Sequence, residues 1–214
     1  MALTPKLQAG VELARGLVAT LRDPQFLPVI YPSLFAEGVL DGSLHATVLS
    51  ALVLAGDRLG FTPVCDAPMF DDLDLALTGD ASKRPDAAWL DRSTRDVRCL
   101  IEFERYTPAS LVPKAKNLLV MGKAAGQTLD LAALVYWSYE HLPRRELANV
   151  VQVFAQGFTH GSGAHFRRLG CLSLVTQVVA TRVAGNRVVI ERITPRVMVV
   201  AGEDKPYMLV ELLM

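Results

Sequence analysis

The sequence predicts an α/β protein, because helix-like and strand-like segments alternate along most of the chain. Residues 5–22 and 44–58 repeat apolar positions at the spacing of an amphipathic or buried helix. Residues 84–91 and 97–106 have the composition of two strands joined by a short polar turn. Residues 129–139 are apolar almost throughout, as expected for a strand that is buried on both faces in the centre of an α/β sheet.

The N-terminal third is expected to hold two helices and one strand. The first helix should end at Asp23-Pro24, because the residue before a proline disfavours the helical conformation. A proline-rich loop follows. Ser43 is a suitable N-cap for the second helix, and Gly60 is a suitable residue to end it. Residues 61–69 are typical of a strand, and residues 70–83 of an acidic loop.

The chain after the two predicted strands should form two helices, a glycine-rich loop and a β-hairpin. Pro113 suits the first turn of a helix, and Gly126 suits its end. Gly185-Asn186 separates two β-rich runs, which is the pattern of a hairpin. The expected ranges of the two helices, the loop and the two strands are 110–125, 144–156, 158–170, 172–183 and 187–200.

The composition excludes several functional classes. The chain of 214 residues is 51% hydrophobic, which excludes a largely disordered protein and suits one domain over residues 1–214. The 22 basic residues balance the 22 acidic ones, which excludes a strongly basic nucleic-acid-binding protein but not a local basic patch.

The lack of a recognisable signal peptide or membrane span and the pattern of the cysteines predict a cytoplasmic protein without a membrane partner. Lys6, Glu12 and Arg15 interrupt the apolar stretch that a signal peptide requires, and no apolar run is long enough to span a bilayer. Three cysteines lie far apart in apolar stretches and lack the spacing of a zinc site, so we expect them to be reduced core residues: Cys65, Cys99 and Cys171.

The turn between the two predicted strands places acidic side chains together. If the hairpin is symmetric about Thr94, Asp86 lies opposite Glu102, with Cβ atoms roughly 5 Å apart on one face of the sheet. Glu104 points to the same face, about 7 Å further along the strand. Carboxylates this close repel one another, and a hard divalent cation removes that penalty. The main-chain carbonyl of Phe103 lies between the two glutamates and can supply a third oxygen ligand.

The stretch RPDAAWLDRSTRDVRCLIEFERY resembles the core motif of the PD-(D/E)xK nucleases, with Pro85-Asp86 before a short hairpin and Glu102-Phe103-Glu104 after it. The flanking segments resemble the family's α-β-β-β-α-β core over about residues 43–139. The resemblance implies a restriction-endonuclease-like α/β fold, in which helices flank a central mixed β-sheet. Residues 1–42 would be an N-terminal helical extension, and residues 140–214 a C-terminal helix and β-hairpin.

The resemblance also implies metal-dependent phosphodiester hydrolysis of DNA, with RNA left open as a substrate. Asp86, Glu102 and the carbonyl of Phe103 would bind Mg²⁺ or Mn²⁺. Glu104 stands where the family normally has lysine. Some restriction endonucleases carry Glu there, and in other members the lysine lies on the next helix. Two sets of candidates follow: the catalytic residues Asp86, Glu102, Glu104 and Lys116, and the accessory residues Lys114, His45 and Glu37.

Several alternatives remain open. Asp86 and Glu104 can instead form surface ion pairs with nearby arginines. The loop 158–170 is either an ordinary loop or a phosphate-binding loop that acts through its basic residues His165, Arg167 and Arg168. Glu104 and the zero net charge favour a rival function, that of a catalytically inactive nuclease-fold protein acting as a nucleic-acid-binding or scaffold module. A small-molecule-binding domain would require a different hairpin register. The apolar end of the chain, MLVELLM, indicates a homodimer surface or an edge strand.

Overall fold

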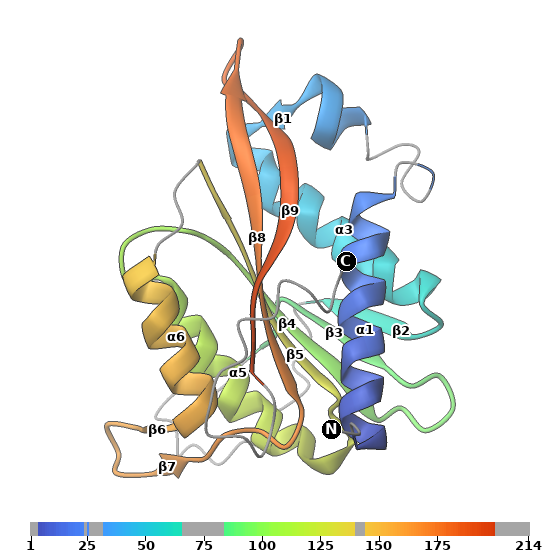
Figure 1. Cartoon of the computed structure of the whole chain (residues 1–214). Helices are drawn as coiled ribbons and strands as arrows, with labels where there is room; N and C mark the ends of the chain where they lie inside the picture. The colour runs from blue at the N-terminus through green and yellow to red at the C-terminus, as the bar shows by residue number, and fades with distance from the viewer. Residues whose placement is uncertain (1–3, 24, 26–31, 66–83, 140–143, 200–214) are drawn as a thin grey trace.

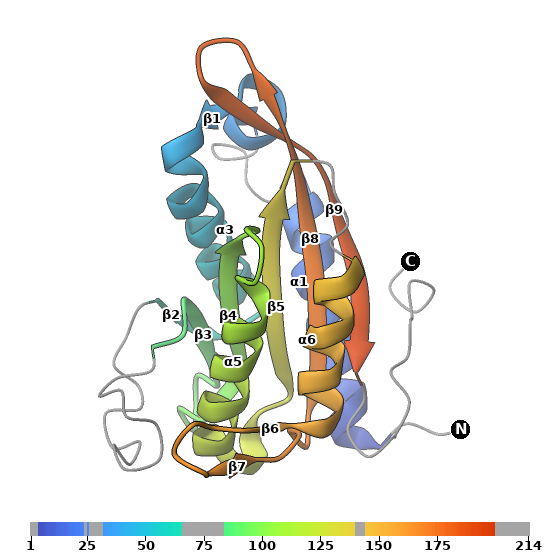
Figure 2. The same cartoon turned by 90° about the vertical axis from the view of Figure 1, so that its left-hand side faces the viewer.

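The protein folds around a seven-stranded mixed β-sheet with helices on both faces (Figures 1 and 2). The structure is a computed structural model, which describes residues 4–23, 25, 32–65, 84–139 and 144–199. The α/β class that the sequence predicts is therefore confirmed.

The strands of the large sheet lie in the order β1-β9-β8-β5-β4-β3-β2. The pairs β4–β5 and β5–β8 are parallel, and the other pairs are antiparallel. A separate small hairpin pairs β6 with β7. The strand bounds are β1 Val39–Leu40, β2 Thr62–Cys65, β3 Ala87–Leu90, β4 Val97–Arg105, β5 Leu131–Ser138, β6 Phe158–Thr159, β7 His165–Phe166, β8 Leu172–Val183 and β9 Arg187–Val199.

Helices α1 and α3 cover one face of the sheet, and α5 and α6 cover the other (Figure 1). Each pair buries its own apolar core against the sheet, so the molecule has three layers. The bounds of the four helices and of three short helical turns are α1 Pro5–Arg22, η1 Ser33–Glu37, η2 Asp41–Ser43, α3 Leu44–Arg58, α5 Leu111–Ala125, η3 Gly126–Thr128 and α6 Arg144–Gln156.

Local sequence signals account for most helix ends. The side chain of Thr4 accepts a hydrogen bond from the N–H of Leu7 and caps α1. Gly126 ends α5 with a φ of 70°, a conformation that glycine adopts without steric cost. Ser43 precedes α3 as predicted, but its side chain makes no capping hydrogen bond because the residue belongs to the preceding turn η2.

Strand β5 lies at the centre of the sheet, and all of its residues are buried. It runs parallel to β4 on one side and to β8 on the other. Because the three strands run in the same direction, the carboxyl ends of β4, β5 and β8 meet at one edge of the sheet. In open α/β sheets this edge is where ligands bind.

Some expectations differ from the structure or fall outside it. Cys65 is exposed, which corrects the expectation that all three cysteines are core residues, whereas Cys99 and Cys171 are buried and reduced. The small β6–β7 hairpin lies within the glycine-rich loop. The predicted strand end at 66–69, the acidic loop 70–83 and the apolar tail lie outside the described residues.

Across the described segments, every helix is too short or too polar to cross a lipid bilayer.

Candidate functional site

The β3–β4 hairpin brings Asp86 and Glu102 to the same place. Ala87 lies opposite Ile101, which is the register predicted from a turn symmetric about Thr94. Asp86 and Glu102 lie one residue beyond the Ala87–Ile101 pair, and both are on the face of the sheet that α5 covers. Asp86 Oδ2 accepts a hydrogen bond from the main-chain N–H of Phe103 (2.7 Å), which fixes the aspartate against strand β4.

The predicted symmetry fails only near the turn. The register shifts between Trp89 and Leu90, so that the hairpin carries an irregularity there. Asp91 Oδ1 accepts hydrogen bonds from the side chain and main chain of Ser93 and from the main chain of Thr94. The bond from the Ser93 side chain is the largest of the effects that lower the pKa of Asp91 to about 2. The irregularity leaves the open end of the hairpin, and therefore the acids, in the predicted register.

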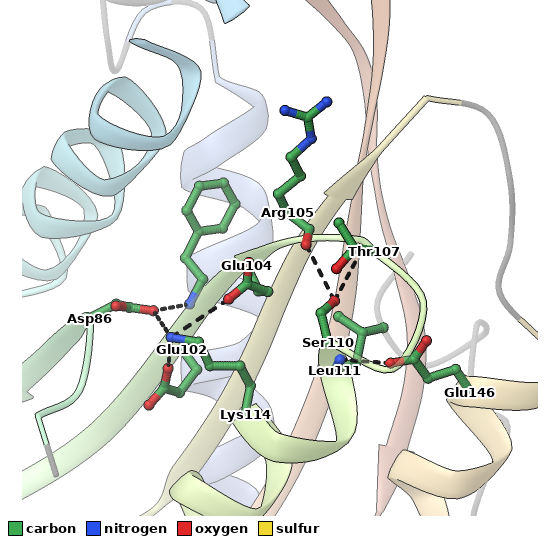
Figure 3. A network of polar contacts seen from close by, with 10 residues as sticks. Asp86, Glu102, Glu104, Arg105, Thr107, Ser110, Leu111, Lys114 and Glu146 are labelled. Carbon is green, nitrogen blue, oxygen red and sulfur yellow. Dashed lines mark hydrogen bonds and ion pairs between the residues drawn. The ribbon is translucent and has the colours of Figure 1, made fainter. Parts of the chain in front are cut away.

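Glu102 is a fully buried carboxylate on β4 (Figure 3). Its Oε2 accepts a hydrogen bond from Lys114 Nζ at 2.6 Å. Burial, helped by the nearby Asp86 and opposed by Lys114, raises the pKa of Glu102 to about 8. A buried carboxylate is costly without a partner, so the position of this side chain depends on the lysine.

Lys114 lies near the start of α5 and points its ammonium group between the acids (Figure 3). Nζ is 2.6 Å from Glu102 Oε2, 3.2 Å from Asp86 Oδ2 and 3.9 Å from Glu104 Oε2. Burial lowers the pKa of Lys114, but the carboxylates of Glu102 and Asp86 outweigh this effect and the pKa is raised overall. We call these four residues the carboxylate–lysine cluster.

Glu104 is the most exposed acid of the carboxylate–lysine cluster, with 30% of its side chain accessible. At 3.9 Å its contact with Lys114 is an ion pair without a hydrogen bond. One ammonium therefore faces three carboxylates, of which Asp86 and Glu102 take the short contacts. The surplus of negative charge makes the cluster attractive to a second cation.

The carboxylate–lysine cluster offers oxygen atoms of the type that hard divalent cations accept as ligands. Glu102 Oε1 is buried and has no hydrogen-bond partner, whereas Oε2 is held by Lys114. Among the described residues, no group of three or more His, Cys, Asp or Glu side chains is arranged to hold a metal. A divalent cation at this place would have two carboxylates, Asp86 and Glu102, with the Phe103 carbonyl and waters as further oxygen ligands, which are the ligand types that Mg²⁺ and Mn²⁺ accept.

The structure does not bring three of the candidate residues to the cluster. Lys116 Nζ lies over the ring of Phe158, 5.2 Å from its centroid, so it turns away from the acids. His45 is exposed on α3, and its ring packs against that of Phe103 on the opposite face of the sheet. Glu37 is exposed at the end of η1, which packs against β9. Lys114, named as an accessory residue, occupies the position expected of Lys116.

The helical pattern of α5 explains why Lys114, and not Lys116, reaches the acids. Lys114 lies three residues after Leu111 and four before Leu118, both of which are fully buried. It therefore stands beside the buried stripe at the end of the helix nearest β4. With roughly 100° per residue, Lys116 stands further round the helix from that stripe.

The basic loop lies away from the carboxylate–lysine cluster. His165, Arg167 and Arg168 line a pocket of about 380 Å³ together with Lys123, near the C-terminal end of α5. Lys114 and Lys123 are separated by roughly 13 Å along the helix axis. Figures 1 and 2 both show α5 running from the end of β4 toward the β6–β7 hairpin. The expected joint action of this loop and the acids is therefore not supported by their placement.

Two further features of the site have no clear signal in the sequence. Glu146 on α6 is buried and accepts hydrogen bonds from the main-chain N–H groups of Leu111 (2.7 Å) and Ala109 (3.1 Å), so it caps α5 from a distant segment (Figure 3). Arg105, the last residue of β4, packs on the ring of Trp137 in β5 and on that of Tyr139 just after β5. Both contacts join residues that are more than 30 positions apart in the chain.

These features define the class of molecule as an α/β protein with a carboxylate–lysine cluster at the carboxyl end of a central strand. Comparisons of the chain with protein-family models, with curated proteins and with solved structures found no match. The function is therefore argued from the chemistry of the site.

Proposed function

We propose that this protein is a metal-dependent nuclease of the restriction-endonuclease-like type, which hydrolyses phosphodiester bonds in DNA. The observation that carries the proposal is the buried Glu102, held by Lys114 and facing Asp86, with one oxygen left without a hydrogen-bond partner. The element order α3-β2-β3-β4-α5-β5 supports it, since it is the α-β-β-β-α-β order expected from the sequence.

Asp86, Glu102 and the Phe103 carbonyl are the proposed ligands of Mg²⁺ or Mn²⁺. The bound ion would stabilise negative charge on a phosphoryl oxygen and make a water easier to deprotonate. Asp86 is held by the N–H of Phe103, and Glu102 is fixed by its burial. The chain thus holds both carboxylates in place before a ligand binds, which lowers the cost of assembling the site.

Lys114 is the proposed catalytic lysine, in place of Lys116. Two of its three N–H donors are directed at Glu102 and Asp86, which leaves one for a water or a phosphate oxygen. Its raised pKa keeps the ammonium charged at neutral pH, as charge stabilisation requires. Glu104, partly exposed beside it, is the proposed residue that orients the attacking water.

The test of this function is cleavage of supercoiled plasmid and of single-stranded DNA with Mn²⁺. Glu102→Gln should lower the rate at least about a hundredfold, which corresponds to about 2.7 kcal/mol of activation free energy. Glu37→Gln, on the exposed turn η1, is the control and should cleave like the wild type. If the wild type and Glu102→Gln cleave at equal rates, or are equally inactive, hydrolysis by this site is ruled out.

The rival function, a non-catalytic nucleic-acid-binding or scaffold module, is favoured by one observation. Lys114 already partners both Asp86 and Glu102, so the three side chains form an ion cluster that needs no metal. For this rival, the wild type would bind DNA without cleaving it, and Mn²⁺ would give no binding heat. Measurements of DNA cleavage, DNA binding and Mn²⁺ binding on the same proteins therefore distinguish the two functions.

A further inference from the structure

Three hollows lie side by side along the carboxyl ends of β4, β5 and β8. The first, of about 470 Å³, is lined by Arg105, Tyr139 and Arg182. The second, of about 390 Å³, shares Arg105 and Tyr139 with the first and adds Tyr106. The third, of about 660 Å³, shares Tyr106 with the second and continues to Arg144-Arg145 at the start of α6. We call this run of hollows the carboxyl-edge groove.

Two arginines of the groove are held in place by aromatic rings. The Cζ atom of Arg105 lies 4.8 Å from the ring centroid of Trp137 and 5.8 Å from that of Tyr139. The Cζ atom of Arg182 lies 4.7 Å from the ring of Tyr139. Stacking on rings orients a guanidinium while leaving its N–H edge available. Both side chains remain substantially exposed, at 47% for Arg105 and 67% for Arg182.

The groove carries an excess of positive charge. Asp41 is the acid that contacts both anchored arginines, at 3.9 Å from Arg105 and 3.8 Å from Arg182. These distances are too long for hydrogen bonds, so the guanidinium donors are not consumed by it. Glu146, which also lines the groove, directs both carboxylate oxygens at main-chain N–H groups of the segment that begins α5. Within the part of the chain that the structure describes, four arginines thus face two acids, Asp41 and Glu146, and Glu146 is already engaged.

The groove adjoins the carboxylate–lysine cluster. Arg105 follows Glu104 on β4, and the carboxylate of Glu104 lies 3.9 Å from Lys114. Successive residues of a strand point to opposite faces, so the two sites lie on either side of the same strand end. Figure 3 shows Arg105 pointing away from Asp86 and Lys114, with Glu104 between them.

We propose that the carboxyl-edge groove binds the phosphate backbone of the nucleic acid, with Arg105 and Arg182 as its principal contacts. The choice of nucleic acid among anionic ligands rests on the proposed function. An elongated groove with arginines at both ends suits a chain of phosphates better than a single small anion. Guanidinium groups bind phosphate oxygens through paired N–H donors, and such contacts weaken as salt rises. The groove, and not the loop with His165, positions the backbone beside the acids.

The test is fluorescence anisotropy with a labelled single-stranded oligonucleotide and with its duplex, in EDTA so that no cleavage occurs. The double variant Arg105→Gln/Arg182→Gln should bind either probe at least about tenfold more weakly. The slope of log K against log salt should fall by about 0.7 per lost contact on the single strand and about 0.9 on the duplex. The matched control Arg167→Gln/Arg168→Gln removes the same charge from the loop near the far end of α5 and should bind like the wild type.

The outcomes separate this inference from the proposed function. Weak binding by the groove variant supports the groove, whether or not the wild type cleaves DNA. Wild-type affinity in the groove variant overturns the groove, even if cleavage depends on Glu102, and so does an absence of wild-type binding. The single variant Arg182→Gln, at a largely exposed position, is the control for misfolding of the double variant. It should give an intermediate affinity and salt slope. Circular dichroism of each variant should match that of the wild type.

Discussion

A carboxylate in the core is the central feature at the scale of single residues. Glu102 is buried within β4, where its neighbours Ile101 and Phe103 pack into the core that α1 and α3 cover. The protein tolerates this because Lys114 supplies a hydrogen bond and a charge from α5. Burial nevertheless dominates and raises the pKa of Glu102 to about 8, so this carboxyl keeps its proton to a higher pH in the folded chain than in the unfolded chain.

The raised pKa of Glu102 predicts that stability falls with rising pH. The unfolded chain releases this proton near its ordinary pKa of 4.5, whereas the folded chain keeps it up to about 8. The stabilising contribution is therefore complete below about 4.5 and is lost between there and about 8. Glu102→Gln should remove that part of the pH dependence, with a difference from the wild type on the order of a few kcal/mol at pH 8. Urea unfolding at several pH values measures it, and parallel pH curves for the two proteins would contradict the burial argument.

The two lysines of α5 should respond differently to substitution. Lys114→Met leaves Asp86 and Glu102 without their shared partner and should cost roughly 1–3 kcal/mol at pH 8, with less cost at pH 5 where Glu102 is protonated. Lys116→Met removes a contact with the ring of Phe158 and should cost less than about 1 kcal/mol. Denaturant unfolding and the plasmid cleavage assay check both. Cleavage lost with Lys116→Met and kept with Lys114→Met would reverse the assignment.

At the scale of elements, the position of α5 determines whether the carboxylate–lysine cluster exists. Ser110 precedes the helix, but its hydroxyl bonds to Thr107 and Arg105 and does not cap the helix. Glu146 of α6 takes that role by accepting hydrogen bonds at the start of α5. The helix that carries Lys114 is thus fixed by a residue on the next helix.

This dependence predicts the effect of Glu146→Ala. Removing both acceptors leaves the N–H groups of Ala109 and Leu111 without these partners, that of Leu111 in a buried position, and should lower the free energy of unfolding by about 2 kcal/mol. Glu146→Gln keeps one carbonyl oxygen and should cost less. Urea denaturation measures both variants. A wild-type unfolding midpoint for Glu146→Ala would mean that α5 is fixed by its apolar contacts alone.

Elements governed by local sequence were predictable. The periodicity of residues 5–22, the apolar run that forms β5 and the Gly185-Asn186 turn each contain their own signal, and the structure confirms these elements. The hairpin register followed from its short turn, which placed Asp86 and Glu102 correctly. The exchange of Lys116 for Lys114 and the cap from Glu146 were missed because they depend on how separate elements pack.

At the scale of the whole molecule, the sheet separates charged groups that the sequence suggested were together. The carboxyl ends of β4, β5 and β8 meet at one edge, while the loop with His165 lies near the other end of α5. A net charge of zero conceals this arrangement, because it averages the arginines of the carboxyl-edge groove with acids elsewhere. The groove could not be predicted, since Arg105 and Arg182 come from different strands and come together only in the folded chain, around Tyr139 and Asp41.

The most direct test of the central claim is calorimetric titration of the protein with Mn²⁺ at pH 8, without nucleic acid. We predict saturable binding by the wild type and by Glu37→Gln, and at least about tenfold weaker binding by both Asp86→Asn and Glu102→Gln, since each loses a charged ligand. No binding heat for the wild type at millimolar Mn²⁺, or unchanged binding by both variants, would contradict a metal site between these two carboxylates.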